Sequence, residues 1–226
     1  MRHKYMPAIA LLVCIGVALL GAPAAAQQPS LGQVISKIEF HYNSLATLQT
    51  QFEQKVSYMG QRPRIERGTV YVRRPQKMRW EYSQPEGKLL VGDGELLHMY
   101  NPMTNQVRRI DLSQSGDLRA LLSFLLGRLR MGRQFRNLRL EPSGGRHVLV
   151  GEGRPGRDPY GRVEFTYDPQ SYTLLHIKVM GHDETVTEFT FEKERVNATL
   201  DLSLFTFRAP AGAEVLDESS PSREGQ

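Results

Sequence analysis

The sequence predicts an α+β protein in which a strongly curved antiparallel sheet forms an incomplete β-barrel and helices cover its concave face as a lid. Three observations lead to this fold class. About eleven or twelve short segments have the two-residue periodicity of strands, and the breaks between them carry Gly, Pro or Asn. Two segments have helical periodicity, and no linker or fixed repeat divides the chain. A sheet of so many strands must curl or close, and broad apolar helices then cover its inner side.

The first residues are expected to form a secretory signal peptide. A short basic start is followed by an apolar run over 8–20 and by Ala24, Ala25 and Ala26, so we expect cleavage after Ala26. The alternative is an N-terminal membrane anchor, but the apolar run is short for a span. The predicted organisation is a signal peptide over 1–26, a single domain over 27–216 and a disordered polar tail over 217–226.

Composition limits the kind of protein. The chain has 226 residues, 40% of them apolar and 23% charged, which is typical of a globular protein and not of a disordered one. Its one cysteine, Cys14, lies in the expected signal peptide and excludes an internal disulfide framework. The formal charge of +5 falls to +3 without Arg2 and Lys4, so charge alone does not indicate a nucleic-acid partner.

The first half of the expected domain begins with a helix over about 31–46. Its apolar residues recur at helical spacing, and Ser30 can cap its first turn. The period then changes to two, and Asp93-Gly94 is a strong hairpin signal. Strands are expected over 48–58, 65–73, 77–82, 88–92, 95–100 and 106–112, paired as an antiparallel meander.

A second helix interrupts the strands over about 117–130. Its leucines recur at i, i+3, i+4, i+7, i+8 and i+11 from Leu118, and Phe124 widens the apolar face. Strands are then expected over 135–140, 146–151, 162–167, 174–179, 186–192 and 204–208.

No pattern of residues indicates catalysis or a bound metal. The histidines stand singly and not at metal-ligand spacing, and the chain has no G-x-S-x-G motif, phosphate-binding glycine loop or H-E-x-x-H motif. Asp183 and Glu184 beside His182 are interpreted as a polar turn. We therefore expect a protein that is not an enzyme and that binds neither metal nor cofactor.

Arginines are concentrated over 128–139. They form either a solvated face or a surface for anionic lipid or a transporter partner, and the solvated face is the favoured interpretation. Binding to anionic vesicles after charge reversal at Arg128, Arg130 and Arg133 tests the alternative.

One stretch resembles a known family. A strand from Gly68 ends in Arg74-Pro75, the next strand ends in Arg79-Trp80-Glu81-Tyr82, and Pro85 and the Asp93-Gly94 hairpin follow. With an upstream Phe52-Glu53-Gln54 and a downstream Phe205-Thr206-Phe207, this order is similar to the periplasmic outer-membrane lipoprotein carriers of the LolA type. The resemblance covers roughly 31–216.

The resemblance implies a monomeric periplasmic carrier that uses no cofactor and binds no nucleic acid. Such a carrier receives lipoproteins from an inner-membrane lipoprotein-releasing transporter, holds their acyl chains in an apolar cavity, and passes them to an outer-membrane receptor. It also implies that Arg74 controls the lid by bonding the backbone of the lid helices, although alternation leaves Arg73 as the other candidate. The residues expected to line the cavity are Met78, Trp80, Tyr82, Leu90, Met99, Leu121, Phe124 and Leu125.

Two other functions remain open at this stage. The same fold could bind another lipid or amphiphile, or could sense mislocalised lipoproteins. The sequence also leaves open whether the apolar interior is a cavity or a filled core.

Overall fold

The computed structural model of the chain describes residues 29–111 and 129–219. In these residues a single sheet of twelve strands has the order β12-β6-β5-β4-β3-β2-β1-β11-β10-β9-β8-β7. The strands are β1 (Thr47–Ser57), β2 (Arg64–Arg73), β3 (Lys77–Gln84), β4 (Glu86–Gly92), β5 (Leu96–Asn101), β6 (Gln106–Asp111), β7 (Arg136–Ser143), β8 (Arg146–Glu152), β9 (Tyr160–Tyr167), β10 (Leu174–Gly181), β11 (Val186–Val196) and β12 (Glu214–Asp217).

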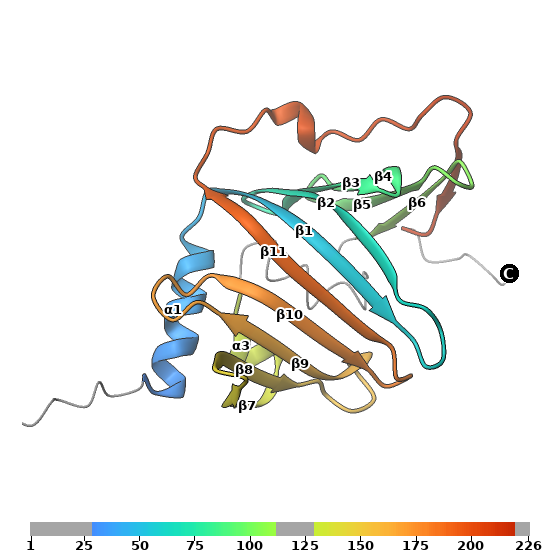
Figure 1. The fold of residues 1–226 in the computed structure, drawn as a ribbon. Helices are drawn as coiled ribbons and strands as arrows, with labels where there is room; N and C mark the ends of the chain where they lie inside the picture. The colour runs from blue at the N-terminus through green and yellow to red at the C-terminus, as the bar shows by residue number, and fades with distance from the viewer. Residues whose placement is uncertain (1–28, 112–128, 220–226) are drawn as a thin grey trace, which may run out of the picture.

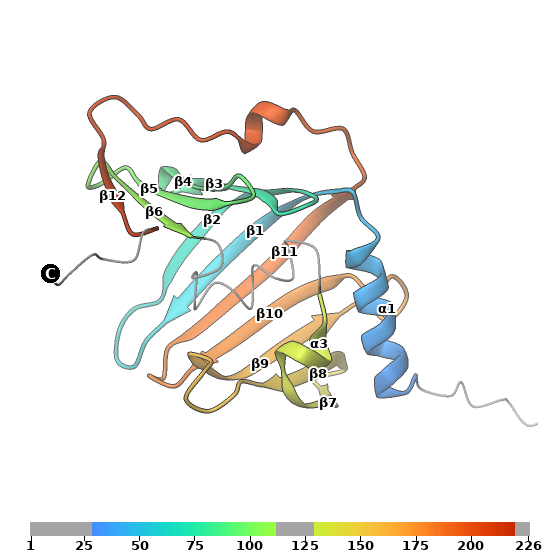
Figure 2. The same ribbon diagram turned by 180° about the vertical axis from the view of Figure 1, so that it is seen from behind.

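The sheet is strongly curved and open. Figures 1 and 2 show β2 to β6 as one side of the curve and β8 to β10 as the other, with β1 and β11 running steeply between them. The two end strands, β7 and β12, do not pair with each other, so the sheet is not a closed barrel. The predicted class of a curved, incomplete barrel is confirmed.

Pairing follows the predicted meander. Each strand from β1 to β6 is antiparallel to the next, and so is each strand from β7 to β11. Antiparallel pairing of β1 with β11 joins the two runs. Only β12 departs from the pattern, because it lies parallel to β6.

Helix α1 (Leu31–Asn43) begins at the predicted cap. The Ser30 Oγ accepts from the Gln33 amide at 3.4 Å, and the Gln33 side chain accepts from the Ser30 amide at 2.9 Å. The helix ends at Asn43 and not near 46, because the Ala46 amide donates to the Asn197 side chain at 2.8 Å. That contact draws the chain into β1.

Most of the buried apolar side chains form one core on the concave side of the sheet. Val34, Ile38 and Tyr42 of α1 join a cluster with Trp80 of β3 and Phe165 of β9. A short helix, α3 (Met131–Gln134), lies in front of β7 and β8 (Figure 2), and Met131 is fully buried. Both helices therefore contribute apolar side chains to the concave side.

The predicted strand over 204–208 is wrong. The segment begins as a short 3₁₀ helix, η2 (Leu202–Phe205), which starts where the Asp201 carboxylate accepts from the Ser203 amide at 2.9 Å. The rest crosses the outer surface of the sheet, where Arg79 donates to the Leu204 carbonyl at 3.3 Å and Phe207 stacks on His98 at 4.7 Å. The alternation of Phe205 and Phe207 reflects packing onto strands, not pairing with them.

The predicted disordered tail starts too early. Asp217 is the last residue of β12, and Glu218 forms an ion pair with Arg108 at 2.8 Å. The expected signal peptide lies outside the described residues, as does most of the expected helix over 117–130. The last two residues of that helix, Leu129 and Arg130, are described and are not helical.

None of the helices in the part of the chain that the structure describes has the length and apolar character needed to cross a membrane.

Candidate functional site

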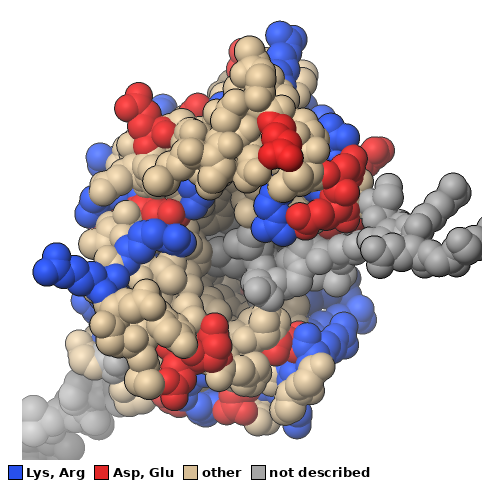
Figure 3. Space-filling model, turned by 90° about the vertical axis from the view of Figure 1, so that its right-hand side faces the viewer, with Lys and Arg blue, Asp and Glu red and all other residues tan. Residues whose placement is uncertain are grey.

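The concave side of β2 to β6 contains a cavity of about 630 Å³. Figure 3 shows the molecule hollowed between its upper and lower parts, with Lys, Arg, Asp and Glu along the rim. This volume lies in the range of about 300–1,000 Å³ that ligand pockets occupy.

Four of the residues expected from sequence line this cavity. Alternation puts Trp80 and Tyr82 of β3 on the concave face, and register sets Leu90 of β4 opposite Trp80 and Met99 of β5 opposite Leu90. Met78 lies on the same face but is fully buried, so it packs below the cavity and not along its wall. Leu121, Phe124 and Leu125 lie outside the described residues.

Two neighbouring aromatic residues were not among those expected. Phe189 of β11 lines the cavity, and its ring lies 5.9 Å from that of Trp80. Phe52 of β1 meets Trp80 edge-on at 4.7 Å and Tyr82 at 5.1 Å. Two features of the sequence could have identified them. Phe189 lies in the alternating strand over 186–192, and Phe52 begins the Phe52-Glu53-Gln54 motif.

Gly68 makes this aromatic packing possible. A Cβ at this position would lie 2.9 Å from the Phe52 ring and 2.1 Å from the Glu81 carbonyl oxygen. The pairing of β2 with β3 also shifts register between Arg67 and Gly68. A side chain here would displace either the ring or the neighbouring strand.

A group of charged residues interrupts the apolar wall. Glu66 is 3% exposed, and its carboxylate accepts from Lys88 Nζ at 2.7 Å, while Arg64 Nε lies 3.4 Å from its other oxygen. The Lys88 ammonium also lies 4.3 Å from the centre of the Tyr82 ring. Burial and the charge of Glu66 raise the pKa of Tyr82, which therefore stays protonated.

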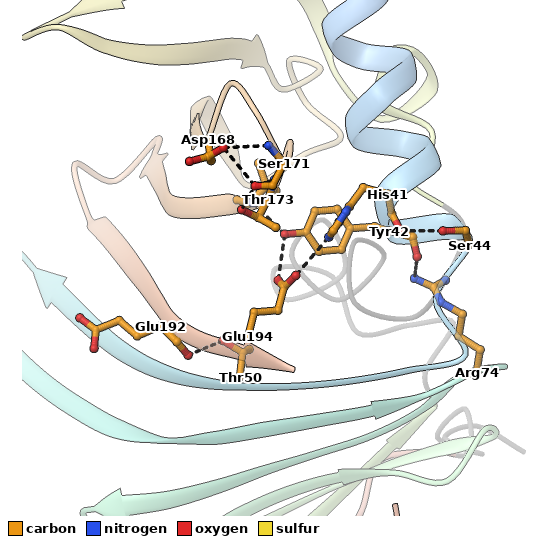
Figure 4. A network of polar contacts seen from close by, with 11 residues as sticks. His41, Tyr42, Ser44, Thr50, Arg74, Asp168, Ser171, Thr173, Glu192 and Glu194 are labelled. Atoms are coloured by element: carbon orange, nitrogen blue, oxygen red, sulfur yellow. Dashed lines mark hydrogen bonds and ion pairs between the residues drawn. The ribbon is translucent and has the colours of Figure 1, made fainter. Parts of the chain in front are cut away.

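Arg74 joins the end of β2 to the last turn of α1. Its guanidinium donates to the Tyr42 carbonyl, which Figure 4 shows directly above the arginine. Burial lowers the pKa of Arg74. Carbonyls in the last turn of a helix lack partners within the helix, so a guanidinium is a suitable donor for them.

The same helix turn is tied to the opposite side of the sheet. The Tyr42 hydroxyl accepts from the Leu174 amide at 2.7 Å and donates to the Glu194 carboxylate at 3.3 Å, and His41 contacts the same carboxylate at 3.1 Å (Figure 4). Burial raises the pKa of Tyr42. Thus α1 is held by Arg74 on one side and by β10 and β11 on the other.

The arginine-rich stretch divides into paired and unpaired members. Arg139 forms ion pairs with Glu141 at 2.7 Å and Glu152 at 2.8 Å, so it belongs to a solvated network. Arg130, Arg133 and Arg136 are exposed and form no ion pair with the described residues. Arg128 lies outside the described residues, and docking through this stretch stays a prediction.

Among the described residues, no three His, Cys, Asp or Glu side chains are grouped so that they could hold a metal ion. Asp183 accepts from the Thr185 amide at 3.0 Å and forms the turn between β10 and β11 that the sequence predicted.

The fold and the site define a class of protein: an open, curved sheet with a partly apolar cavity on its concave face. Comparison with known proteins identifies the family. The model of the family described as "Outer membrane lipoprotein carrier protein LolA" matches residues 43–208, which is more than half of the chain. The chain therefore belongs to the LolA family, as the resemblance indicated.

Curated relatives have moderate identity over nearly their full length. The outer-membrane lipoprotein carrier protein of Methylococcus capsulatus is 29% identical, covering 94% of this chain and 100% of the relative. The protein of the same name from Chromobacterium violaceum is 26% identical, covering 83% of this chain and 89% of the relative.

A solved structure supports the fold. An uncharacterised conserved protein from Thermus thermophilus has a TM-score of 0.53 with 15% identity, covering 84% of this chain and 99% of that one. A LolA superfamily protein from Nitrosomonas europaea has a TM-score of 0.46 with 12% identity, covering 79% of this chain and 98% of that one.

Proposed function

We propose that this protein is a periplasmic carrier that binds lipoprotein acyl chains in the cavity of β2 to β6 and moves them from the inner to the outer membrane. The observation that carries the proposal is the cavity itself, whose wall includes Trp80, Leu90 and Met99 in a chain of the LolA family. An inner-membrane transporter would load the carrier and an outer-membrane receptor would unload it.

The physical demands of this task agree with the site. Each acyl methylene that leaves water contributes about 0.8 kcal/mol, so a carrier must offer apolar surface and still release its load. An open cavity with a flexible methionine in its wall can adapt to chains of different shape. Release would then depend on movement of α1, which Arg74 restrains at the Tyr42 carbonyl.

The cargo is tested by native purification from the periplasm followed by mass spectrometry of bound lipids and peptides. Co-purification of triacylated lipoprotein is the expected result. Free glycolipid in its place would overturn the proposal and favour a binding protein for another amphiphile. Recovery of empty protein with no lipid under loading conditions would overturn both.

The site is tested with the natural reporter that the chain provides, because Trp80 is its one tryptophan and lines the cavity. A nitroxide on an acyl chain of a bound lipopeptide should quench Trp80 fluorescence. Filling the cavity with Leu90→Phe and Met99→Phe should weaken binding by about tenfold, since one acyl segment of two methylenes is worth that much.

The matched control is Leu175→Phe, which adds the same atoms at an exposed leucine. This variant should leave affinity unchanged. Binding without quenching of Trp80, or equal affinities for the control and the filled cavity, would place the acyl chains elsewhere.

A further inference from the structure

The cavity has one feature that acyl chains alone do not require, which is the buried charge of Glu66. Glu66 is 3% exposed in a wall that also contains Trp80, Leu90 and Phe189. Burying an ion pair costs solvation that mutual attraction often only offsets, so Glu66 and Lys88 contribute little to stability compared with apolar side chains of the same size. A polar ligand at this point would give the pair a role.

The geometry of the charged residues leaves them able to bind a ligand. Arg64 and Lys88 approach separate oxygens of Glu66, and each carboxylate oxygen can accept more than one hydrogen bond. The Lys88 ammonium has three N–H donors and the Arg64 guanidinium five, so donors remain beyond those that face Glu66. The cluster thus offers both acceptors and donors at the cavity wall.

A second observation points to an acceptor on the ligand. The indole Nε1 of Trp80 is buried and has no hydrogen-bond partner among the described residues. A buried N–H without an acceptor is costly, and a ligand oxygen would satisfy it. Trp80 lines the same cavity as Glu66, Lys88 and Arg64.

We infer that Glu66, Lys88 and Arg64 form a head-group subsite for a neutral, amide-bearing acylated ligand. This inference rests on the proposed function and names the polar group that the carrier recognises. An amide presents an N–H that Glu66 can accept and a carbonyl to which Lys88, Arg64 or Trp80 can donate. A phosphate presents acceptors only, so it can use the donors of Lys88 and Arg64 but offers no N–H to the Glu66 carboxylate.

The apolar and polar parts of the cavity therefore recognise different parts of the ligand. Trp80, Leu90, Met99 and Phe189 bind hydrocarbon regardless of what it is attached to. The charged cluster discriminates between the amide-linked end of an acylated peptide and an anionic phospholipid of the same chain length.

The experiment uses three short-chain nitroxide-labelled probes read out by quenching of Trp80. They are a neutral S-diacylglyceryl, N-acyl cysteinyl peptide amide, a phosphatidylglycerol with the same chains, and an alkane without a head group. The unsubstituted protein should bind the lipopeptide more tightly than the phosphatidylglycerol.

The double variant removes both charges of the Glu66–Lys88 pair, so neither residue is left as an unpaired buried ion. Glu66→Gln with Lys88→Met should weaken lipopeptide binding by about tenfold, the size of one lost hydrogen bond to a charged group, and leave alkane binding within twofold. Glu66→Gln alone should raise phosphatidylglycerol affinity, because the cations then lack their carboxylate.

The control is Glu53→Gln, which removes a carboxylate 2.6 Å from Arg67 on the outer face of the sheet. It should alter none of the three affinities. Unchanged lipopeptide affinity in the double variant, or an equal loss for lipopeptide and alkane, would overturn the subsite and leave the carrier proposal standing. Failure of the alkane and the lipopeptide to bind the unsubstituted protein would overturn both.

Discussion

The concave face of the sheet has two halves that are filled differently. Over β8 to β10, Leu149, Phe165 and Ile177 are buried against the segment that carries Met131 and Phe135. Over β2 to β6, the same alternation of strand residues leaves a cavity of about 630 Å³. The sheet thus has a packed core on one side and a cavity on the other.

The difference depends on what faces each half. Gly151 of β8 leaves room for the Phe135 side chain, because a Cβ at position 151 would lie 2.7 Å from the Cβ of Phe135. In the other half the glycine that admits an aromatic ring is Gly68, and that ring, Phe52, belongs to the sheet itself. Strand periodicity is therefore the same for a core and a cavity. Among the described residues, Met131 and Phe135 add apolar side chains to the core over β8 to β10.

The largest expected effect is on the free energy of unfolding, when one leucine in each half of the concave face is truncated to alanine. Leu149→Ala should lower the free energy of unfolding by about 4 kcal/mol, because Leu149 is fully buried and its removal leaves a closed void. Leu90→Ala should cost about 2 kcal/mol, because Leu90 already borders open space. Urea unfolding of both variants measures the difference, and equal losses would show that the two halves are packed alike.

A smaller effect is expected where the halves are tied together. Arg74 links the end of β2 to α1, which is also held by β10. Arg74→Lys should weaken the contact between β2 and α1 by about 1–2 kcal/mol. A lysine ammonium lacks the planar guanidinium that places a donor at the Tyr42 carbonyl. Hydrogen exchange of the Ser44 amide, which follows α1 and donates to the Phe40 carbonyl, should then quicken about 5–30-fold.

The neighbouring Arg73→Lys is the control for that tie. It should not change exchange in α1, because the structure gives the contact with Tyr42 to Arg74. Faster exchange in the Arg73 variant alone would reverse the assignment of the lid-control residue.

The smallest expected effect is on acid stability and compares one hairpin from each half. Partial burial alone would raise the pKa of Asp93, but the Leu96 and Glu95 amides and His98 outweigh it and lower the pKa. The Ser171 and Gln170 amides lower the pKa of Asp168. A lowered folded-state pKa gives stability that is present above the ordinary value of about 4 and is lost as pH falls through the folded-state pKa.

Asp93→Asn should therefore flatten the loss of stability below about pH 4 more than Asp168→Asn does. Asp93 also holds His98, on which Phe207 stacks, whereas Asp168 caps only its own turn. Thermal unfolding at pH 7 and pH 3 measures both, with Glu95→Gln as the control. An Asp93 variant that loses as much stability in acid as the parent would contradict the assignment.

The sequence predicted the strand order of the meander well because alternation, turn residues and short loops are local signals. It also predicted that Trp80 and Tyr82 share a strand face and that Leu90 and Met99 are their neighbours, and the observed register places them so. These predictions needed only the period of the chain and its turns.

The features that the sequence did not predict all depend on contacts between residues far apart in the chain. The end of α1 depends on Asn197, and the extended course of 204–208 depends on Arg79 and His98 on the outer surface. The pairing of Glu66 with Lys88 joins residues 22 positions apart through the curvature of the sheet. None of these contacts has a local periodicity that a reading of the sequence could detect.

The parallel strand β12 has a consequence for handling the protein. It covers the free edge of β6 along Gln106 to Arg109, and Arg109 holds Asp217 at 3.0 Å. A truncation before Glu214 would expose a row of unpaired backbone donors and acceptors that another chain could extend. Strand β12 thus protects the edge of β6 from pairing with another chain. A purification tag or fusion at this end should therefore leave residues 214–218 intact.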